Sequence, residues 1–440
     1  MNRAFIESSF SILIMLAFVP LSGGSLGEKS NETLILAGNY WDGLADGPLG
    51  PAEVLIIDGK IAKVGKNVTH NEAAKVIDLS GMFLMPGFID SHVHLTINPD
   101  VIAALPTYSD AALTLAGINA CKILLHNGFT TVRDAGDLSI NSWVVPELKK
   151  AVASGSIRGP RIICGGHMIS ALGGHFDFGG MLRAGAALDQ VSVAEGVDGV
   201  RRAVHNEVRH GADWIKVAGS GGFLSPSDGP EDASYSQEEM NAIVNASTDL
   251  GKPVFVHAYG DEPVHRAAAA KVRSIEHASM ASVQTLKMIA ENGIYVVPTQ
   301  MALVPVARDA VNGTFDPKEP EWARQKDLKY APQILESSRN LAKSDVKIAL
   351  GTDVGTFDYS KNGAAEFSEM VRNGIAPLRA LKAGTSMAAE MLQLNDTGII
   401  ALGKRADLVA LAGNPFENMS ATENVRLVMK EGVVYRNDVK

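Results

Sequence analysis

The chain has 440 residues, of which 46% are hydrophobic and 20% are charged, which is the composition of a folded globular protein and not of a disordered or collagen-like chain. Asp and Glu number 49 against 40 Lys and Arg, and no basic run could neutralise a phosphate backbone, so we expect no nucleic-acid partner. Two cysteines, Cys121 and Cys164, are too few for a disulfide framework or a thiolate cluster. A metal ion would therefore need histidine and carboxylate ligands.

The first residues have the pattern of a targeting segment. Arg3 precedes an apolar run over residues 10–19, and small residues follow over 22–25. Because the run is shorter than the about 20 residues of a membrane-spanning helix, it predicts a secretory signal peptide over residues 1–25. We expect an exported protein, periplasmic or secreted, without stable membrane insertion after cleavage. A cytoplasmic protein is the alternative if this leader is not a signal peptide.

Short β-rich runs separated by turn residues occupy both ends of the remaining chain. At the start they lie at 33–36, 53–57, 59–64 and 76–79, and at the end at 406–411 and 425–435. Residues 32–86 and 400–440 are therefore predicted to form one composite β-sandwich.

Between these ends, over residues 87–399, short apolar strands alternate with amphipathic helices. This alternation predicts βα units and a parallel sheet, and eight units favour a (β/α)8 barrel. An open, doubly wound sheet would give the same alternation, so periodicity alone leaves that choice open. The predicted strands are 88–95, 129–133, 161–165, 214–218, 254–257, 274–277, 294–298 and 347–351, with helices over 110–126, 195–210, 236–250 and 281–292 among the connections.

Side chains able to bind a metal ion stand at the ends of several predicted strands. In a (β/α)8 barrel the C-terminal strand ends form the rim of the active site, so side chains far apart in the sequence would converge there. This convergence is the central prediction from the sequence. The residues are His92 and His94 after the first strand, Lys216 in the fourth, His257 and His277 ending the fifth and sixth, and Asp353 after the eighth.

Each of these residues also has a plainer interpretation. His92 and His94 point to the same face of a strand and could chelate one ion, but an isolated H-x-H is often structural. Four of the 11 histidines at strand ends are harder to explain in that way. Lys216 among apolar neighbours could be ion-paired, or it could be a neutral amine that reacts with carbon dioxide to give a metal-bridging carbamate. Asp353 could cap a turn, or it could bind a metal and accept the proton of an attacking water.

In this order the motifs resemble the amidohydrolase superfamily over nearly all of the chain after the leader. The sequence is most similar to the branch related to imidazolonepropionase, which includes Xaa-Pro dipeptidases and ochratoxin-type amide hydrolases. The branch-level motifs are Gly173-Gly174-His175 and the stretch from Ser220 to Ser236. The superfamily motifs are 85–94 (MPGFIDSHVH), 215–217 with 220–222, 274–277 (SIEH), 351–353 (GTD) and 403–409 (GKRADLV).

The resemblance implies a TIM-like barrel with a composite β-sandwich and two zinc ions. One ion would lie on His92, His94 and Asp353 and the other on His257 and His277. A carboxylated Lys216 and a hydroxide would bridge them. Zinc lowers the pKa of bound water and polarises a carbonyl, so hydroxide would attack an amide carbon while the aspartate passes the proton to the leaving nitrogen. Manganese, iron or cobalt would also accept these ligands.

Four further residues are predicted to contact substrate. His175 and Tyr235 resemble positions that bind the carboxylate of a peptide-like substrate in this branch, although a loop histidine and a packing tyrosine are the alternative. His167 is a competing candidate for the role of His175. Relatives often have a second histidine two residues after the fifth-strand ligand, where this chain has Tyr259, so its substrate pocket can differ.

The sequence therefore predicts a binuclear zinc amidohydrolase acting on a carboxylate-bearing small molecule, either an Xaa-Pro-like dipeptide or an N-acyl amino acid. The alternatives are a hydrolase of cyclic amides, such as an imidazolone or lactam, and a hydrolase of mycotoxin amides. A non-catalytic binding protein on the same scaffold is disfavoured because all six predicted ligands are present. By resemblance we also expect a homo-oligomer.

Overall fold

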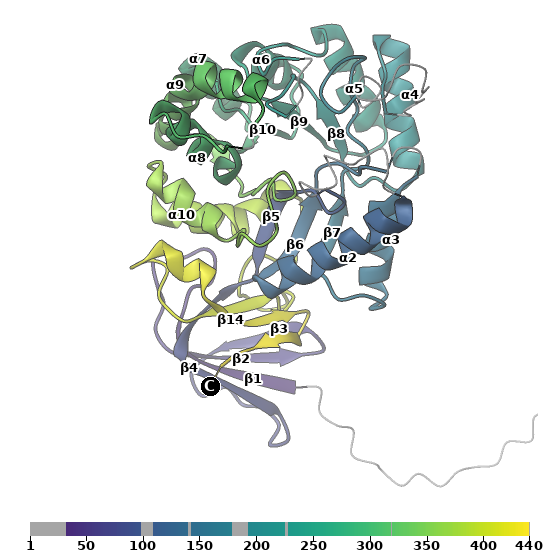
Figure 1. The fold of residues 1–440 in the computed structure, drawn as a ribbon. Helices are drawn as coiled ribbons and strands as arrows, with labels where there is room; N and C mark the ends of the chain where they lie inside the picture. Colours follow the sequence, from purple (N-terminus) through teal and green to yellow (C-terminus); the bar gives the residue numbers. More distant parts are fainter. Residues whose placement is uncertain are drawn as a thin grey trace, which may run out of the picture.

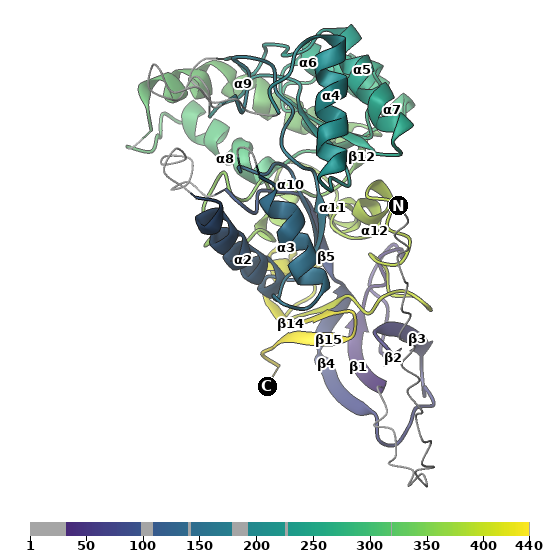
Figure 2. The same ribbon diagram turned by 90° about the vertical axis from the view of Figure 1, so that its right-hand side faces the viewer.

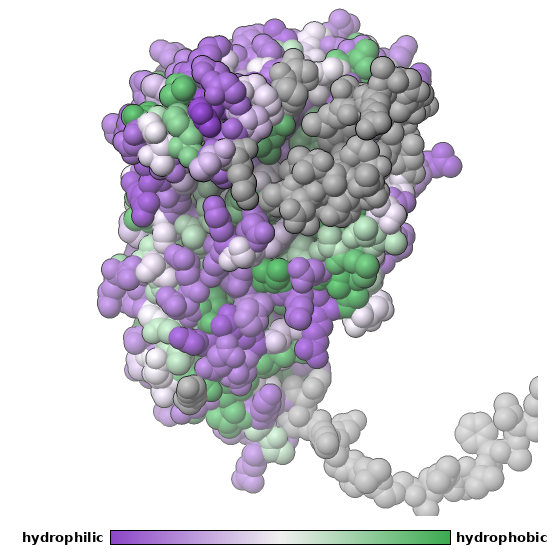
Figure 3. All heavy atoms as spheres, in the orientation of Figure 1, coloured by the Kyte–Doolittle hydropathy of each residue, from purple (hydrophilic) through white to green (hydrophobic). Residues whose placement is uncertain are grey.

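The computed structural model describes residues 32–97, 109–139, 142–177, 192–224, 228–317 and 319–439. The predicted signal peptide lies outside these residues. Figure 1 shows a barrel domain above a smaller β-sheet module, and Figure 2 gives the same arrangement from the side. Among the described residues, no helix has the length and apolar character needed to cross a bilayer. The face seen in Figure 3 is mostly hydrophilic, with scattered apolar side chains.

The β-sheet module combines the two ends of the chain. Its long strand β4 pairs in parallel with β1 and, through Phe83–Pro86, antiparallel with β13. The edge strand β3 also contacts the segment before β13, because Ile61 N donates to Lys404 O at 2.8 Å, and apolar residues of both chain ends share one core. The order is β15-β14-β13-β4-β1-β2-β3, with bounds β1 Glu32–Tyr40, β2 Ala52–Ile57, β3 Lys60–Gly65, β4 Lys75–Pro86, β13 Leu408–Leu411, β14 Val425–Lys430 and β15 Val433–Asn437.

The eight barrel strands form two parallel runs, β5-β6-β7 and β8-β9-β10-β11-β12. Backbone hydrogen bonds close both seams: Ser91 N donates to Leu350 O at 2.8 Å, and Ile169 N donates to Lys216 O at 3.0 Å. The sheet is therefore a closed (β/α)8 barrel, as predicted, and not a doubly wound open sheet. Its strands are β5 Phe88–Val93, β6 Phe129–Asp134, β7 Arg161–Cys164, β8 Ile215–Ala218, β9 Val254–Ala258, β10 Ser274–His277, β11 Tyr295–Val297 and β12 Lys347–Ile348.

Helices surround the barrel, and the four predicted from the sequence agree with α2, α4, α5 and α7 to within two residues at each end. Local chemistry explains their ends: Ser236 and Glu239 form a reciprocal capping box at the start of α5. The bounds are α2 Asp110–His126, α3 Val144–Ala153, α4 Gly196–Arg209, α5 Gln237–Asp249, α6 Asp261–Ala269, α7 Val283–Glu291, α8 Gln300–Val311, α9 Glu321–Lys343, α10 Ala365–Arg372, α11 Pro377–Ala383, α12 Ser386–Met391 and the 3-10 helix η3 Met419–Glu423.

One connection departs from a simple βα alternation. Between β11 and β12 the chain forms two helices, α8 and α9, which pack against each other and lie on the same side of the barrel as α10 (Figure 1). The turn residues Asn312, Gly313 and Pro317 lie between the two helices. The pair matters for function because both helices help to line the cavity described below.

Candidate metal centre and substrate cavity

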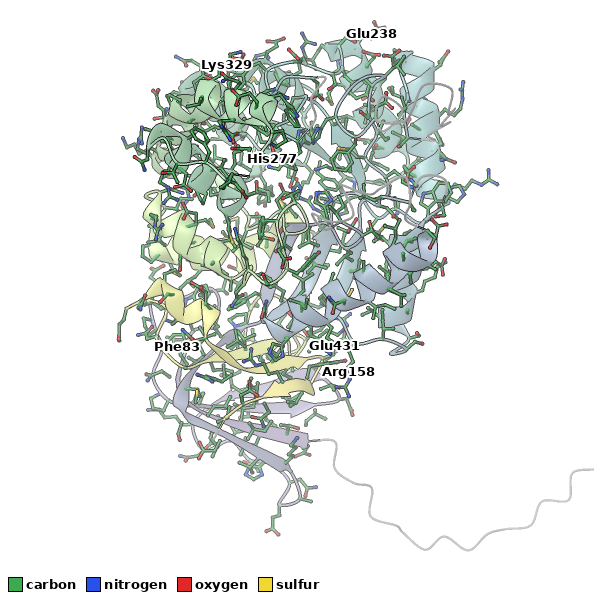
Figure 4. All side chains as sticks on the ribbon, viewed as in Figure 1. Phe83, Arg158, Glu238, His277, Lys329 and Glu431 are labelled. Carbon is green, nitrogen blue, oxygen red and sulfur yellow. The ribbon has the colours of Figure 1, made fainter. Side chains whose placement is uncertain are left out.

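The predicted ligands converge at the C-terminal ends of the barrel strands. Figure 4 marks His277 inside the ring of helices, whereas Lys329 and Glu238 lie on its outer surface. Among the described residues, His92, His277 and Asp353 each offer a ligand atom within 4.8 Å of the other two. The sequence assigned His92 and His277 to different ions, so the structure brings both predicted ligand sets into one cluster.

Asp353 lies between the two histidines of β5. Its Oδ1 atom is 3.4 Å from Nε2 of His92 and 3.2 Å from Nε2 of His94. The carboxylate is 5% exposed, and Oδ1 has no hydrogen-bond partner among the residues that the structure describes. A buried anionic oxygen without a donor is costly, so this atom is available to bind a cation or a proton.

The histidines of β9 and β10 form the second half of the cluster. Nδ1 of His257 is 2.9 Å from Nε2 of His277, and Nε2 of His257 is 3.3 Å from the carbonyl oxygen of Gly221. Burial, followed by neighbouring positive charge, holds the pKa of His92, His257 and His277 well below the usual range. These imidazoles are therefore neutral, which is the form that binds metals.

Lys216 is fully buried in β8. Within the described part of the chain its Nζ atom finds no hydrogen-bond partner, and it lies 5.1 Å from the centre of the Phe255 ring. Burial lowers its pKa to about 8, against the opposing charges of Glu276 and Asp353. Nitrogen donors from four histidines, an unpaired carboxylate oxygen and an unpaired amine fit divalent transition-metal ions, which accept N and O ligands at low coordination number.

A second layer of buried polar residues, to which the sequence gave no role, orients His92. Nδ1 of His92 is 2.7 Å from one carboxylate oxygen of Glu276, and the other oxygen accepts from Nη2 of Arg133 at 2.9 Å and from Oγ of Ser274 at 2.6 Å. Because the carboxylate accepts the Nδ1 hydrogen, Nε2 of His92 keeps its lone pair towards Asp353. Glu276 was visible in the SIEH motif, but only the strand register shows its contact.

The backbone is left-handed at several non-glycine residues of this region, among them His277 (φ 68°), Thr299 (φ 42°) and Asp353 (φ 62°). Such conformations cost of order 1–3 kcal/mol each and cluster at functional sites. Here each of these residues turns the chain sharply at or after the C-terminal end of a strand. The strained turns therefore aim side chains into the barrel mouth.

A cavity of about 640 Å³ opens onto the cluster. His175 and Tyr259 line it beside the predicted ligands: His175 stacks on His257 with ring centres 4.5 Å apart, and Tyr259 stacks on His277 at 4.6 Å. Burial lowers the pKa of His175 to about 3, so this imidazole is neutral. The rest of the wall is largely apolar and includes Ile97, Leu138, Met168, Phe176, Phe223, Leu224, Met301, Leu303, Pro305, Val306 and Phe357.

The structure does not bring the other two predicted substrate residues to this wall. Tyr235 is 1% exposed, and its hydroxyl donates to the carbonyl oxygen of Ala194 at 3.1 Å, so it packs behind the loops. His167 lies against α4, where Nδ1 is 3.1 Å from a carboxylate oxygen of Glu207. Neither residue is among the described residues that line the cavity. Proximity in sequence to a site loop did not determine where these side chains point.

Comparison with known proteins agrees with this geometry. The model of the amidohydrolase family matches residues 83–435. The ochratoxinase of Aspergillus niger is 32% identical over 433 residues, covering 91% of this chain and 85% of that protein. A crystal structure of an Xaa-Pro dipeptidase with methionine bound in its active site is 35% identical, with a TM-score of 0.84 and coverage of 92% of this chain and 100% of that one. A prolidase structure complexed with N-methylphosphonate-L-proline is 31% identical, with a TM-score of 0.82 and the same coverage.

Proposed function

Since the chain belongs to the amidohydrolase family and is a hydrolase of carbon–nitrogen bonds, we propose that it cleaves the amide bond of a carboxylate-bearing substrate, an Xaa-Pro-like dipeptide or an N-acyl amino acid. One observation carries this proposal: a buried cluster of metal-binding side chains lies at the inner end of an apolar cavity large enough for a dipeptide. The cluster would supply the chemistry, and the cavity would hold the side chains of the substrate.

Two zinc ions are the cofactor that we propose. His92, His94 and Asp353 would hold one ion, and His257 and His277 the other. When bound, such ions lower the pKa of water and polarise the scissile carbonyl. The unpaired Nζ of Lys216 supports a carbamate between the two ligand sets, formed when the neutral amine adds to carbon dioxide and loses a proton. The two carbamate oxygens would then serve as bridging ligands.

Asp353 is the proposed proton carrier. Asp353 lines the cavity, and its unpaired Oδ1 lies beside His92 and His94. The carboxylate would accept the proton of the attacking water and deliver it to the leaving nitrogen. Glu276 does not transfer this proton, because its two carboxylate oxygens already form hydrogen bonds with His92 and Arg133.

His175 is the proposed contact for the substrate carboxylate. It lines the cavity next to His257, and as a neutral imidazole it would donate one N–H to the anion. Related structures have been solved with methionine and with a proline phosphonate, and both ligands carry an amino-acid carboxylate. Tyr259, stacked on His277, would offer its hydroxyl as a second donor at the same end of the cavity.

The apolar wall favours a second candidate, a bulky aromatic amide such as a mycotoxin. Phe223 packs edge-on against Tyr259 and Tyr330, so this side of the cavity presents aromatic surface to a ligand. The relative from Aspergillus niger is named ochratoxinase. Both candidates require the same reaction and differ only in the group that fills the outer cavity.

The remaining parts of the proposal concern the state of the protein. We propose that residues 1–25 are a signal peptide and that the mature protein is exported and assembles as a homo-oligomer. The molecular mass of the exported chain, measured by mass spectrometry, tests whether the signal peptide has been cleaved. Light scattering of that protein tests assembly.

A hydrolysis screen tests the function. Zinc-loaded protein and chelator-treated protein would be given Xaa-Pro and other dipeptides, N-acyl amino acids, aromatic amides and lactams, with Asp353→Asn as the inactive control. We expect chelator-sensitive release of a C-terminal amino acid. Turnover of lactams alone would move the assignment to cyclic amides. Equal turnover by the Asp353→Asn variant would contradict the proposed chemistry.

A further inference from the structure

Thr299 makes a direct contact with the metal cluster that the mechanism above does not use. Its Oγ1 atom is 2.7 Å from Nδ1 of His277, and the threonine is 1% exposed. On the other side of the ring, Nε2 of His277 is 2.9 Å from Nδ1 of His257. Both nitrogens of His277 are therefore engaged, and the hydrogen on this neutral ring can be on either one.

The neighbouring groups restrict where hydrogens lie. The carbonyl oxygen of Gly221 can only accept, so Nε2 of His257 carries a hydrogen and Nδ1 of this neutral ring carries none. A hydrogen bond between the two rings then requires the hydrogen on Nε2 of His277. Nδ1 of His277 is bare in that tautomer, and the Thr299 hydroxyl must donate to it.

Metal binding demands the opposite tautomer of His277. A ring that binds an ion through Nε2 needs a lone pair there, so its hydrogen must be on Nδ1. The partner of Nδ1 must then accept. A hydroxyl group can rotate to donate or to accept, whereas a carboxylate can only accept and an ammonium group can only donate.

We propose that Thr299 is a positioning residue of the metal centre, whose hydroxyl donates to Nδ1 of His277 when the two histidines are hydrogen-bonded and accepts from it when His277 binds a metal ion. This inference rests on the metal-dependent activity proposed above. Thr299 directly precedes α8, and residues of this helix also form part of the apolar wall of the cavity. The start of α8 would therefore position His277, and the helix itself would contact the substrate.

The backbone around Thr299 supports a positioning role. Thr299 is left-handed (φ 42°, ψ 49°), which is a rare conformation for a β-branched residue. The first turn of α8 is held directly after it, because the buried carboxylate of Glu366 accepts from the N–H groups of Gln300 at 2.8 Å and Met301 at 2.6 Å. Glu366 of α10 therefore holds the backbone that follows Thr299, and the Thr299 hydroxyl has a defined position next to His277.

Cobalt binding to metal-stripped protein tests this inference. Thr299→Val removes the hydroxyl and keeps the shape, and Thr299→Ser restores the hydroxyl. Thr285→Val is the matched control, because Thr285 is also buried (3% exposed) but lies on α7, where its hydroxyl contacts Ser282. Affinity comes from titration, and the ligand field from the visible absorption of bound cobalt, so neither readout depends on turnover.

We expect Thr299→Val to weaken one of two cobalt sites about 10–100-fold and to shift its absorption, with recovery in Thr299→Ser and no change in Thr285→Val. Thr299→Ala gives the same comparison if the valine variant does not fold. Cobalt affinity and absorption that match the unmodified protein in Thr299→Val or Thr299→Ala would overturn the inference while leaving the proposed function intact. Failure of the unmodified protein to bind cobalt would overturn both.

Discussion

Replacement of Glu276 by glutamine tests whether the buried layer behind the cluster controls the metal centre. Glu276 and Arg133 are both fully buried, and the carboxylate contacts His92, Arg133 and Ser274. The Glu276→Gln substitution would keep the volume but would remove the negative charge. The new amide NH2 group would also face one of the groups that now donate a hydrogen bond to the carboxylate.

The size of the effect follows from the charge left behind. Removing one partner of a buried ion pair costs about 3–5 kcal/mol, since Arg133 would stay charged in the barrel interior after losing its ion-pair partner. Loss of an orienting hydrogen bond to a metal-binding histidine costs about 10–100-fold in metal affinity. We therefore expect Glu276→Gln to lower both the free energy of unfolding and the affinity for zinc.

Urea unfolding of metal-free protein and zinc titration measure the two effects separately. Glu147→Gln is the control, because the 2.6 Å pair of Glu147 with Lys150 is exposed (68% and 71%) and contributes about 0–1 kcal/mol. A Glu276→Gln variant with the stability and zinc affinity of the unmodified protein would refute this reasoning.

Four further predictions concern the site itself. Asp353→Asn should lower kcat by about 10²–10⁴-fold with little change in KM, and steady-state kinetics measure both. His175→Phe keeps a ring in place but removes the N–H, so kcat/KM should fall more for free-acid dipeptides than for their C-terminal amides; equal losses would assign His175 to packing. Lys216→Ala should lose bound metal, measured by elemental analysis, with partial recovery in acetate. A variant that keeps its metal and its activity would contradict the bridging role of Lys216. Gly351→Ala places a Cβ 2.4 Å from Cγ1 of Val297, so thermal unfolding should show a loss of about 1–3 kcal/mol.

The barrel and the location of its active end could be predicted from the sequence because two signals agreed. Alternating apolar strands and helices indicated the order of the elements, and the polar residues at strand ends indicated which end of the barrel carries the site. His92, His257, His277 and Asp353 are far apart in the sequence but lie in one cluster, because parallel strands place their C-terminal ends together.

The residues behind the cluster could not be predicted. Arg133 and Glu276 lie on β6 and β10, which are not neighbours in the sheet, and their contact depends on the stagger of the closed barrel. Thr299 has no motif at all: its role depends on a left-handed turn that the tertiary structure imposes against its own preference. Tyr235 and His167 were drawn from loops close to the site in sequence, where the direction of a side chain is set by packing against Ala194 and Glu207.

The central claim is that the buried histidine and aspartate cluster holds the metal ions that drive amide hydrolysis. The most direct test adds zinc in steps to chelator-stripped protein and measures, in the same samples, bound zinc and hydrolysis of the best dipeptide from the screen. We predict that activity returns with zinc and stops rising at two equivalents per chain, and that His277→Ala neither retains the zinc nor regains the activity. Full hydrolysis by stripped protein in excess chelator, or by His277→Ala, would contradict the claim.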